Sequence, residues 1–142
     1  MTHVESDIKD QWLIGEGQHE RHHLIVRQNV GVRPIVGDAH YPFRVGIAIQ
    51  FKSPQKDGMP SQDEAQLFSR IEDLIYDYFD AKHTGVLCLV ITTQGMREFI
   101  VYSITDAVAD LTGSLSQHFP AYDTQHYVEQ DREWDVYKQW DL

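Results

Sequence analysis

The chain has 142 residues, of which 42% are hydrophobic, and a formal net charge of −10 at neutral pH. This size and composition predict one globular domain and exclude a disordered chain, and no apolar run approaches the roughly 18 residues that a membrane-spanning helix needs. Residues 61–142 hold fifteen Asp and Glu against five Lys and Arg, which argues against binding to nucleic acid because phosphates are neutralised by basic residues.

Residues 1–10 are polar and mixed in charge, unlike the apolar centre of a secretory signal, and this predicts a cytoplasmic protein. Residues 11–14 and 21–28 are predicted to form two short strands. The polar segment 15–20, which contains two glycines, is predicted to be the turn that joins them. We therefore expect an N-terminal strand pair ahead of the rest of the fold.

The clearest strand signal covers residues 43–51, after a predicted loop over residues 31–40 that contains several turn-forming residues. Apolar residues recur there at every second position, which places them on one face of a strand. These residues are Phe43, Val45, Ile47, Ile49 and Phe51. The other face includes the small residues Gly46 and Ala48, so we expect another part of the molecule to lie close against it.

A long helix is predicted to begin at Ser61. The Ser61 side chain can accept a hydrogen bond from the amide of Glu64 while Glu64 reaches back, which is the capping-box pattern. Apolar residues then recur at spacings of three and four, as on the buried side of a helix. They are Leu67, Phe68, Ile71, Leu74, Ile75 and Tyr78. Asp73, Asp77 and Asp80 share the opposite side, and we name these three residues the acidic stripe.

Residues 85–93 are apolar nearly throughout, which predicts a strand that is covered on both faces. Cys88, the only cysteine, lies inside this run. A single cysteine cannot form an internal disulfide, and its aliphatic neighbours predict core packing rather than a reactive thiolate. A tight turn over residues 93–96 leads into a returning strand over residues 97–104.

A second helix is predicted to begin at Thr105 or Asp106 and to stop before Pro120. Its apolar residues are Val108, Leu111, Leu115 and Phe119. Residues 122–129 follow as a last strand, and the tail carries aromatic residues at every third position, which predicts a short packed helix. These aromatic residues are Trp134, Tyr137 and Trp140.

From residue 43 onward the predicted order is strand, helix, strand, strand, helix, strand. This is the element order of the ferredoxin-like fold, in which both helices cover one face of an antiparallel sheet. We therefore predict that residues 1–142 form a single α+β domain of ferredoxin-like βαββαβ topology, with the N-terminal strand pair as an addition.

No motif of an enzyme active site is found in the sequence. There is no Gly-x-Ser-x-Gly elbow, no Cys–His signature, no phosphate-binding loop and no dinucleotide fingerprint. His19, His22 and His23 are close in sequence, but successive strand residues point to opposite faces, so a zinc site is not expected there. We therefore predict no catalytic residues, no metal and no cofactor.

Residues 97–102, Arg-Glu-Phe-Ile-Val-Tyr, have some likeness to the basic and aromatic strand of the RNA recognition motif. Glu98 stands where that motif has a small glycine, and its charge would repel phosphates. The second aromatic motif is also missing from the sequence. The segment is therefore predicted to be an ordinary alternating strand, and nucleic acid is not expected as a partner.

Several segments occur in the same order in a known bacterial family. They are Leu24-Ile-Val-Arg-Gln-Asn29, Tyr41-Pro-Phe-Arg-Val45, Asp57-Gly-Met-Pro60, Ile71-Glu-Asp73, Gly95-Met-Arg-Glu-Phe-Ile-Val-Tyr102 and Trp134-Asp-Val-Tyr137. From Trp12 to Trp140 the chain therefore resembles the domain of unknown function 695. Because that family has no established activity, the resemblance implies no catalytic residue. Some members look fused or related to the regulator of ribonuclease activity B, a small acidic protein that resembles an enzyme inhibitor, which implies a regulatory role.

The favoured function is a non-enzymatic protein-interaction or regulatory module. The sequence contains no assembled catalytic set, and its second half has an excess of negative charge. The acidic stripe, formed by Asp73, Asp77 and Asp80, is expected to meet a basic protein partner. No membrane partner is expected, because no apolar segment is long enough to span a bilayer.

The alternative function is an enzyme or small-ligand sensor with a pocket on the open face of the sheet. Arg27, Arg44 and Arg97 all lie on predicted strands, and arginine side chains bind anions through several N–H groups at once. These three residues would then clamp an anionic ligand. Self-association through an exposed edge or face of the sheet is a third expectation, which is compatible with either function.

Overall fold

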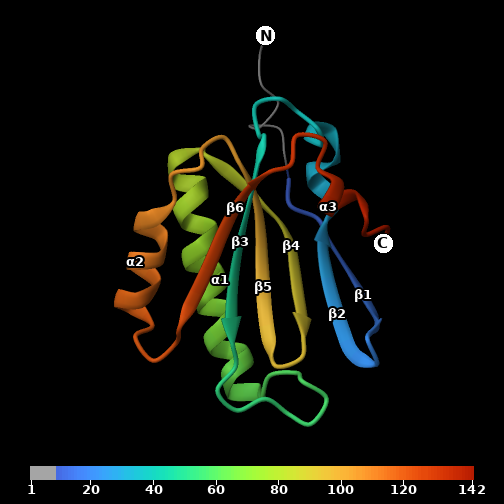
Figure 1. Ribbon diagram of the computed structural model, residues 1–142, viewed down its shortest axis with the longest axis vertical. Helices are drawn as coiled ribbons and strands as arrows, with labels where there is room; N and C mark the ends of the chain where they lie inside the picture. Colours follow the sequence, from blue (N-terminus) through green and yellow to red (C-terminus); the bar gives the residue numbers. More distant parts are fainter. Residues whose placement is uncertain (1–8) are drawn as a thin grey trace.

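Six antiparallel strands form one sheet in the computed structural model, which describes residues 9–142 (Figure 1). The strands are β1 (Trp12–His19), β2 (His22–Asn29), β3 (Phe43–Gln50), β4 (Gly85–Thr93), β5 (Met96–Ser103) and β6 (Thr124–Gln130). The helices are η2 (Val30–Ile35), which is a 3₁₀ helix, α1 (Gln62–Lys82), α2 (Ala109–His118) and α3 (Asp135–Lys138). Across the sheet the strands follow the order β1-β2-β4-β5-β3-β6. The predicted α+β class is confirmed.

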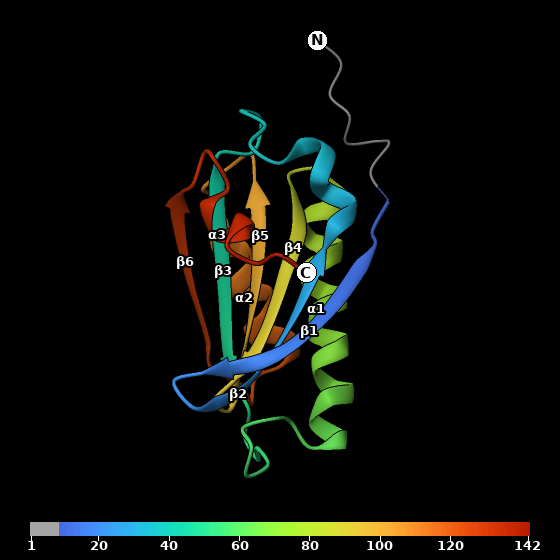
Figure 2. The same ribbon diagram turned by 90° about the vertical axis from the view of Figure 1, so that its right-hand side faces the viewer.

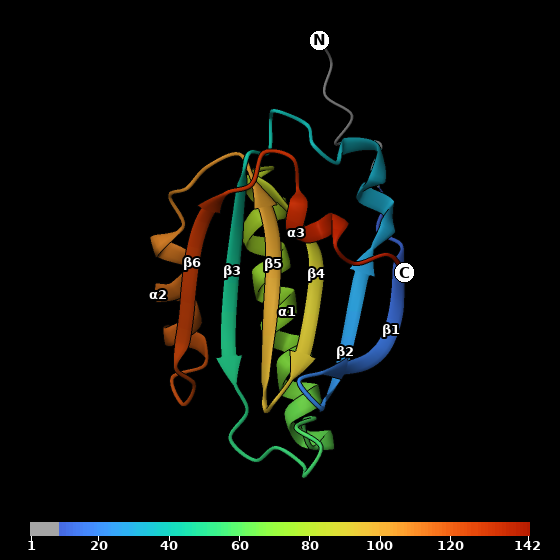
Figure 3. The same cartoon turned by 45° about the vertical axis from the view of Figure 1, so that its right-hand side comes forward.

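The long helices α1 and α2 cover one face of the sheet, behind the strands in Figure 3. Their apolar sides pack against alternate residues of the central strands, and Phe68, Ile75 and Leu111 have no exposed surface. Val45 and Ile47 of β3 are equally buried beneath them. Each such side chain contributes about 1.5–3 kcal/mol through burial. The predicted apolar sides of both helices and of β3 are therefore confirmed.

None of the described helices is long and apolar enough to cross a membrane.

A second core lies on the opposite face, beneath η2, α3 and the C-terminal tail. Trp134 is fully buried, and its ring stacks on Tyr102 with 4.0 Å between centroids and an interplanar angle of 11°. The Trp134 indole N–H donates to the carbonyl of Tyr41 at 3.0 Å, and the Tyr137 hydroxyl donates to the carbonyl of Asn29 at 2.7 Å. The predicted short packed helix in the tail is confirmed. It covers only part of this face, and the strand ends below it in Figure 3 carry no helix on that side.

The N-terminal hairpin differs from the prediction because β1 is longer than expected. Residues 15–20 are predicted as a turn, but the strand continues to His19 and only Glu20 and Arg21 form the turn, with φ angles of 51° and 68°. β1 is the edge strand nearest the viewer in Figure 2, and it is exposed along most of its length. An edge strand of this kind tolerates glycine and polar residues, and these hide the alternation that would identify it.

The segment 31–40 is not the plain loop that the sequence predicts. It begins within η2, which Asn29 caps by accepting a hydrogen bond from the amide of Gly31 at 3.1 Å. Val32 and Ile35 of this helix are buried in the second core. A spacing of three places both residues on the same side of a helix with three residues per turn. The turn-forming residues in the segment conceal this short apolar pattern.

Ser61 caps α1 as predicted, but only half of the capping box forms. The Ser61 hydroxyl accepts a hydrogen bond from the amide of Glu64 at 3.2 Å. The Glu64 carboxylate turns away and accepts hydrogen bonds from the amides of Lys52 and Ser53 and from the hydroxyl of Tyr122. Glu64 therefore joins the start of α1 to the end of β3 and to the segment before β6.

The second helix begins later than the predicted Thr105 or Asp106. The Thr105 hydroxyl accepts a hydrogen bond from the amide of Ala107 at 3.1 Å, so it closes a turn that precedes the helix. Val108 occupies the N-cap position of α2 without a side-chain hydrogen bond, and its own side chain is buried. Burial of the predicted apolar residues is confirmed, and packing rather than capping determines where α2 begins.

Candidate functional site

The acidic stripe lies on the outward side of α1. Asp73, Asp77 and Asp80 are exposed, and none of them forms an ion pair with a residue of the described range 9–142. Tyr76 lies beside them and is 38% exposed. Partial burial, together with the negative charges of Asp10, Asp80 and Asp77, raises the pKa of Tyr76. This side of α1 is therefore a negative surface that carries a partly exposed aromatic ring.

Arg27 and Arg97 lie on the face of the sheet that α1 covers. Arg27 donates two hydrogen bonds to Glu72 of α1, at 2.7 and 3.1 Å, and its guanidinium lies 4.7 Å from the ring centroid of Trp12. Arg97 Nε donates to the hydroxyl of Thr92 at 2.8 Å. Burial lowers the pKa of Arg97, while the charge of Glu72 opposes that shift. Both arginines are therefore held by neighbours within the protein.

Arg44 lies on the opposite face, because it alternates along β3 with residues of the helical core. Its guanidinium donates to Asp131 at 2.9 Å and to Glu129 at 2.6 Å. Burial by itself would lower the pKa of Arg44, but hydrogen bonds to Asp131 and Tyr127 raise it. The sheet separates this arginine from the other two. No single anion can therefore contact all three predicted clamp residues.

A groove lies on the open face of the sheet, beside the C-terminal tail, and we name it the sheet groove. Its volume is about 370 Å³, within the range of roughly 300–1,000 Å³ that is typical of small-molecule sites. Leu24, Ile91 and Ile100, from three neighbouring strands, form an apolar floor. Val136 of α3 and Trp140 of the tail line it as well.

The polar side of the sheet groove is a hydrogen-bonded pair that spans β3. The Tyr127 hydroxyl of β6 donates to Glu98 of β5 at 2.6 Å. Burial, with the Glu98 carboxylate, raises the pKa of Tyr127. The Tyr127 ring passes over Gly46, where an added Cβ would lie 2.1 Å from Tyr127 Cζ. The predicted close approach to the small face of β3 is confirmed, and the approaching group is this ring.

Gly46→Ala is expected to lower the free energy of unfolding by about 1–3 kcal/mol, because the new methyl group pushes the Tyr127 ring away from Glu98. Gly17→Ala is the matched control, since an added Cβ there meets nothing within 4 Å. Its effect should stay within about 0.5 kcal/mol. Urea unfolding of both variants measures the difference, and equal losses would contradict the close approach of Tyr127.

The tail that borders the groove is held by Gln28. Its side-chain amide donates to the carbonyls of Tyr137 at 3.3 Å and Trp140 at 2.7 Å. Two donors of groove-lining side chains, Arg44 Nε and Trp140 Nε1, are buried and have no hydrogen-bond partner within residues 9–142. Because both atoms are buried, a molecule in the groove cannot contact them unless the side chains move.

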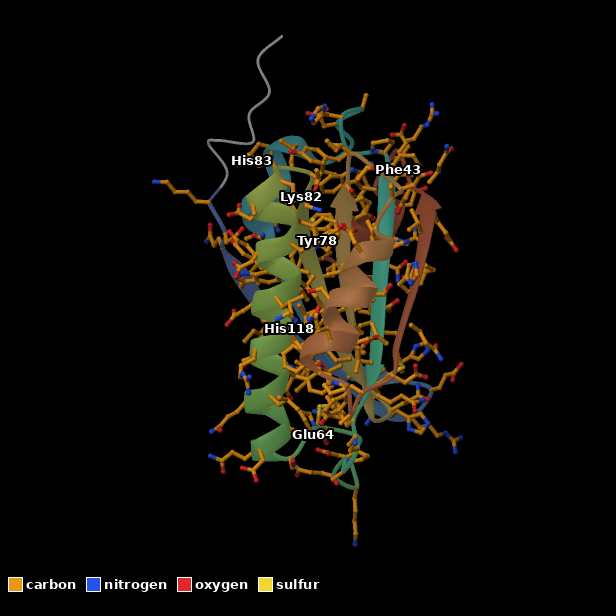
Figure 4. All side chains as sticks on the ribbon, turned by 90° about the vertical axis from the view of Figure 1, so that its left-hand side faces the viewer. Phe43, Glu64, Tyr78, Lys82, His83 and His118 are labelled. Atoms are coloured by element: carbon orange, nitrogen blue, oxygen red, sulfur yellow. The ribbon has the colours of Figure 1, made fainter. Side chains whose placement is uncertain are left out.

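A second polar cluster joins α1 to α2, and Figure 4 labels its two residues from α1. The Tyr78 hydroxyl donates to Asp110 of α2, and the Lys82 ammonium donates to the same carboxylate at 3.2 Å. Burial and the bond to Asp110 raise the pKa of Tyr78 to about 12, while bonds from Tyr78 and Lys82 lower the pKa of Asp110. All three groups have partners, so the cluster links the two helices.

The histidines near the hairpin and Cys88 do not form a reactive arrangement. His22 and His23 are successive residues of β2, and His19 pairs with His22 across the hairpin. Within residues 9–142, no three His, Cys, Asp or Glu side chains are placed to hold a metal ion. Cys88 is fully buried, and burial raises the pKa of its thiol, so it does not ionise at neutral pH.

Residues 10–140 match the model of a protein family described as "Family of unknown function (DUF695)". The chain belongs to this family. The match confirms the resemblance that the ordered segments indicate, and it includes every strand and helix of the fold. Comparisons with curated proteins and with solved structures found no match. The description of DUF695 states no activity, so function has to be argued from the sites themselves.

Glu98, Tyr127 and Trp140 are far apart in the sequence, and no local pattern predicts that they meet. They come from β5, from β6 and from the tail, and only the folded sheet places them around one groove. One signal is present in the sequence: Gly46 in an otherwise regular strand indicates a close neighbour. It does not identify Tyr127, because the pairing of β3 with β6 cannot be read from local pattern.

Proposed function

We propose that this DUF695 chain is a non-enzymatic protein-interaction module that binds a basic partner through the acidic stripe. The observation that supports this proposal is that Asp73, Asp77 and Asp80 are exposed and form no ion pair with any of residues 9–142, beside the partly exposed Tyr76. Like charges at this spacing on a helix repel one another, and a basic surface relieves that repulsion. Aromatic residues often supply much of the binding energy at protein interfaces.

Other carboxylates of the two long helices contrast with the stripe. Glu72 is paired with Arg27, and Asp110 is paired with Lys82. Within α1 and α2, the three carboxylates of the acidic stripe thus keep their charge unmatched by any ion pair with residues 9–142. A module of this kind would regulate its partner by covering a basic surface.

The unpaired, buried thiol of Cys88 is compatible with a cytoplasmic location.

We also propose that β3 to β6, with α1 and α2, form a ferredoxin-like unit. The chain order from β3 is strand, helix, strand, strand, helix, strand, and the neighbours run β4-β5-β3-β6. Both long helices lie on one face of these strands (Figure 3). The β1–β2 hairpin then extends the sheet beyond β4. In this arrangement one side of α1 packs on the sheet and the acidic stripe faces outward.

Reversing the stripe in the triple variant Asp73→Lys, Asp77→Lys and Asp80→Lys is expected to weaken partner binding by at least about tenfold. The measurement is affinity capture from the native host by the tagged full chain at low salt, with the retained proteins identified by mass spectrometry. The wild-type chain should retain a basic protein in stoichiometric amount. Rising salt should release that protein, because exposed charges are screened.

A second triple variant with the same change in net charge is the control: Asp106→Lys, Asp123→Lys and Glu133→Lys. These three carboxylates are exposed, form no ion pair among the described residues and lie outside α1. The control variant should retain the partner within about threefold of wild type. If both variants lose the partner equally, general charge and not the stripe is responsible. Retention of no basic protein by the wild-type chain would contradict the proposed function.

A further inference from the structure

The sheet groove is lined by one arginine and one carboxylate, Arg44 and Glu98, and the arginine is already paired with two other carboxylates. The charge of Arg44 is matched by Asp131 and Glu129, and Glu98 adds another carboxylate, so these groups hold one positive charge against three negative ones. The groove lies on the face of the sheet opposite the helices. The groove is therefore separated by the sheet from the acidic stripe, and binding in the groove does not depend on the function proposed for that stripe.

The groove combines an apolar floor with aromatic borders and one available carboxylate oxygen. One oxygen of Glu98 accepts the hydrogen bond from Tyr127, and the other accepts none from residues 9–142. Ile91 lies directly opposite Glu98 in the β4–β5 register, so the apolar floor begins next to the carboxylate. Tyr127 and Trp140 both line the groove. Carboxylates and aromatic rings are the groups that attract organic cations.

We propose that the sheet groove is a binding site for an alkylammonium group. The ammonium would donate to the available oxygen of Glu98 near the rings of Tyr127 and Trp140. The alkyl chain would lie along Ile91 and Ile100. This placement satisfies the charge with a carboxylate and buries the hydrocarbon against an apolar floor, which are the two requirements of an amphipathic cation.

An anionic ligand does not fit the same groove. It would approach the carboxylate of Glu98, and Arg44, the arginine of the groove, already donates to two carboxylates. Arg44 Nε and Trp140 Nε1, which have no hydrogen-bond partner within residues 9–142, are buried, so an anion in the groove would not reach them. The groups that face the groove therefore select a cation.

The test uses three probes that share a six-carbon chain: hexylamine, hexanoate and hexan-1-ol. Each is titrated into the full ¹⁵N-labelled chain and followed by backbone-amide and indole NMR signals. Hexylammonium is expected to shift the signals of Glu98, Tyr127 and Trp140 in a saturable way. Hexanoate and hexan-1-ol should bind at least about tenfold more weakly. Binding of hexanoate as tight as that of hexylammonium, or no saturable shift in the groove, would overturn the proposal.

Glu98→Gln tests the carboxylate within the same titration. The glutamine side chain keeps an acceptor for Tyr127 but removes the charge, so hexylammonium should bind about five- to tenfold more weakly. Asp73→Asn on α1 makes the same change in net charge far from the groove and should leave the affinity unchanged. Equal losses in both variants would overturn the role of Glu98. If Glu98→Gln unfolds the chain, the three-probe comparison on wild type still decides the proposal.

The alkylammonium chemistry is shared by free amines and by the lysine side chain of another protein. Nα-acetyl-lysine N-methylamide carries this group on a peptide-like backbone, and it is compared with hexylamine in the same titration. Tighter binding of the lysine amide assigns the groove to a lysine of a partner protein. Tighter binding of hexylamine assigns it to a free amine. If neither compound binds in the groove, the proposal is overturned.

Discussion

Replacing Asp131 with alanine is expected to lower the free energy of unfolding by about 3–5 kcal/mol, because it removes the buried partner of a buried charge. The Asp131 side chain is 5% exposed and that of Arg44 is 12% exposed. Without Asp131, Glu129 is the one carboxylate among residues 9–142 that still pairs with the guanidinium, and Glu129 lies largely in water. Chemical denaturation followed by tryptophan fluorescence measures the loss.

Asp131 has this large role because several groups converge on it. It accepts hydrogen bonds from Arg44 at 2.9 Å, from the Tyr102 hydroxyl at 2.7 Å, and from the amides of Asp135 and Val136 at 2.7 and 3.2 Å. Burial by itself would raise the pKa of Asp131, but these hydrogen bonds outweigh it and lower the pKa. The residue therefore fixes the start of α3, which carries one border of the sheet groove.

Glu129→Ala is the matched control, because Glu129 contacts the same arginine but its side chain is 61% exposed. Solvent-exposed ion pairs contribute little, so we expect a loss of at most about 1 kcal/mol. Similar losses in the two variants would mean that burial does not determine the strength of these contacts. That result would contradict the account given for Asp131.

Glu64→Gln is expected to lower the free energy of unfolding by about 2–3 kcal/mol. The Glu64 carboxylate is buried and accepts hydrogen bonds from the amides of Lys52 at 2.6 Å and Ser53 at 2.9 Å, and from the Tyr122 hydroxyl at 2.7 Å. Glutamine replaces one acceptor oxygen with an N–H donor, which then faces other donors. Urea unfolding at neutral pH measures the loss.

The effect of Glu64→Gln should depend on pH in a defined direction. Burial by itself would raise the pKa of Glu64, but hydrogen bonds from Tyr122, Lys52 and Ser53 outweigh it and lower the pKa below the ordinary value of 4.5. A carboxylate whose pKa is lower in the folded state stabilises the protein fully above its unfolded pKa and loses that contribution as pH falls through the folded value. The difference between wild type and Glu64→Gln should therefore shrink below about pH 4.5.

Asp63→Asn is the control for this variant, because Asp63 is the exposed neighbour in the same first turn of α1. Asp63 forms no ion pair with another of residues 9–142, so its interaction with the helix dipole sets the expected loss at about 0.3–1 kcal/mol. A pH-independent difference between wild type and Glu64→Gln would contradict the role of the Glu64 charge.

Local periodicity accounts for the parts of the fold that the sequence predicts well. The alternation in β3, the apolar side of α1 and the continuous apolar run of β4 each report burial on one or both faces. The aromatic spacing of the tail works in the same way, since Trp134 and Tyr137 are both buried. Each of these elements packs at least one side against the core, and the apolar residues on that side recur at regular spacing in the sequence.

Local pattern fails where an element is exposed, where its apolar pattern is too short to repeat, and where its contacts come from distant segments. β1 lies at the sheet edge and consists largely of exposed glycine and polar residues, so it looks like a turn. Glu64 matches a capping box by spacing, but its partners Lys52 and Tyr122 come from other elements. The start of α2 is decided by burial of Val108 rather than by a capping side chain.

The candidate sites also differ in whether a local sequence pattern predicts them. The acidic stripe is a local feature of one helix, so its exposure follows from the spacing of Asp73, Asp77 and Asp80. Whether Arg27 and Arg44 share a face of the sheet depends on how their strands pair with the neighbouring strands. In the structure the two residues lie on opposite faces. The sheet groove is assembled from distant strands and the tail, and no local pattern predicts it.

Binding through the acidic stripe can be tested by mapping the captured basic partner on the ¹⁵N-labelled chain by NMR. Amide signals of residues 73–80, with Tyr76 among the most affected, are expected to shift at low salt and to return as salt is raised. Shifts confined to the edge strands β1 and β6 or to the sheet groove, with α1 unchanged, would contradict it.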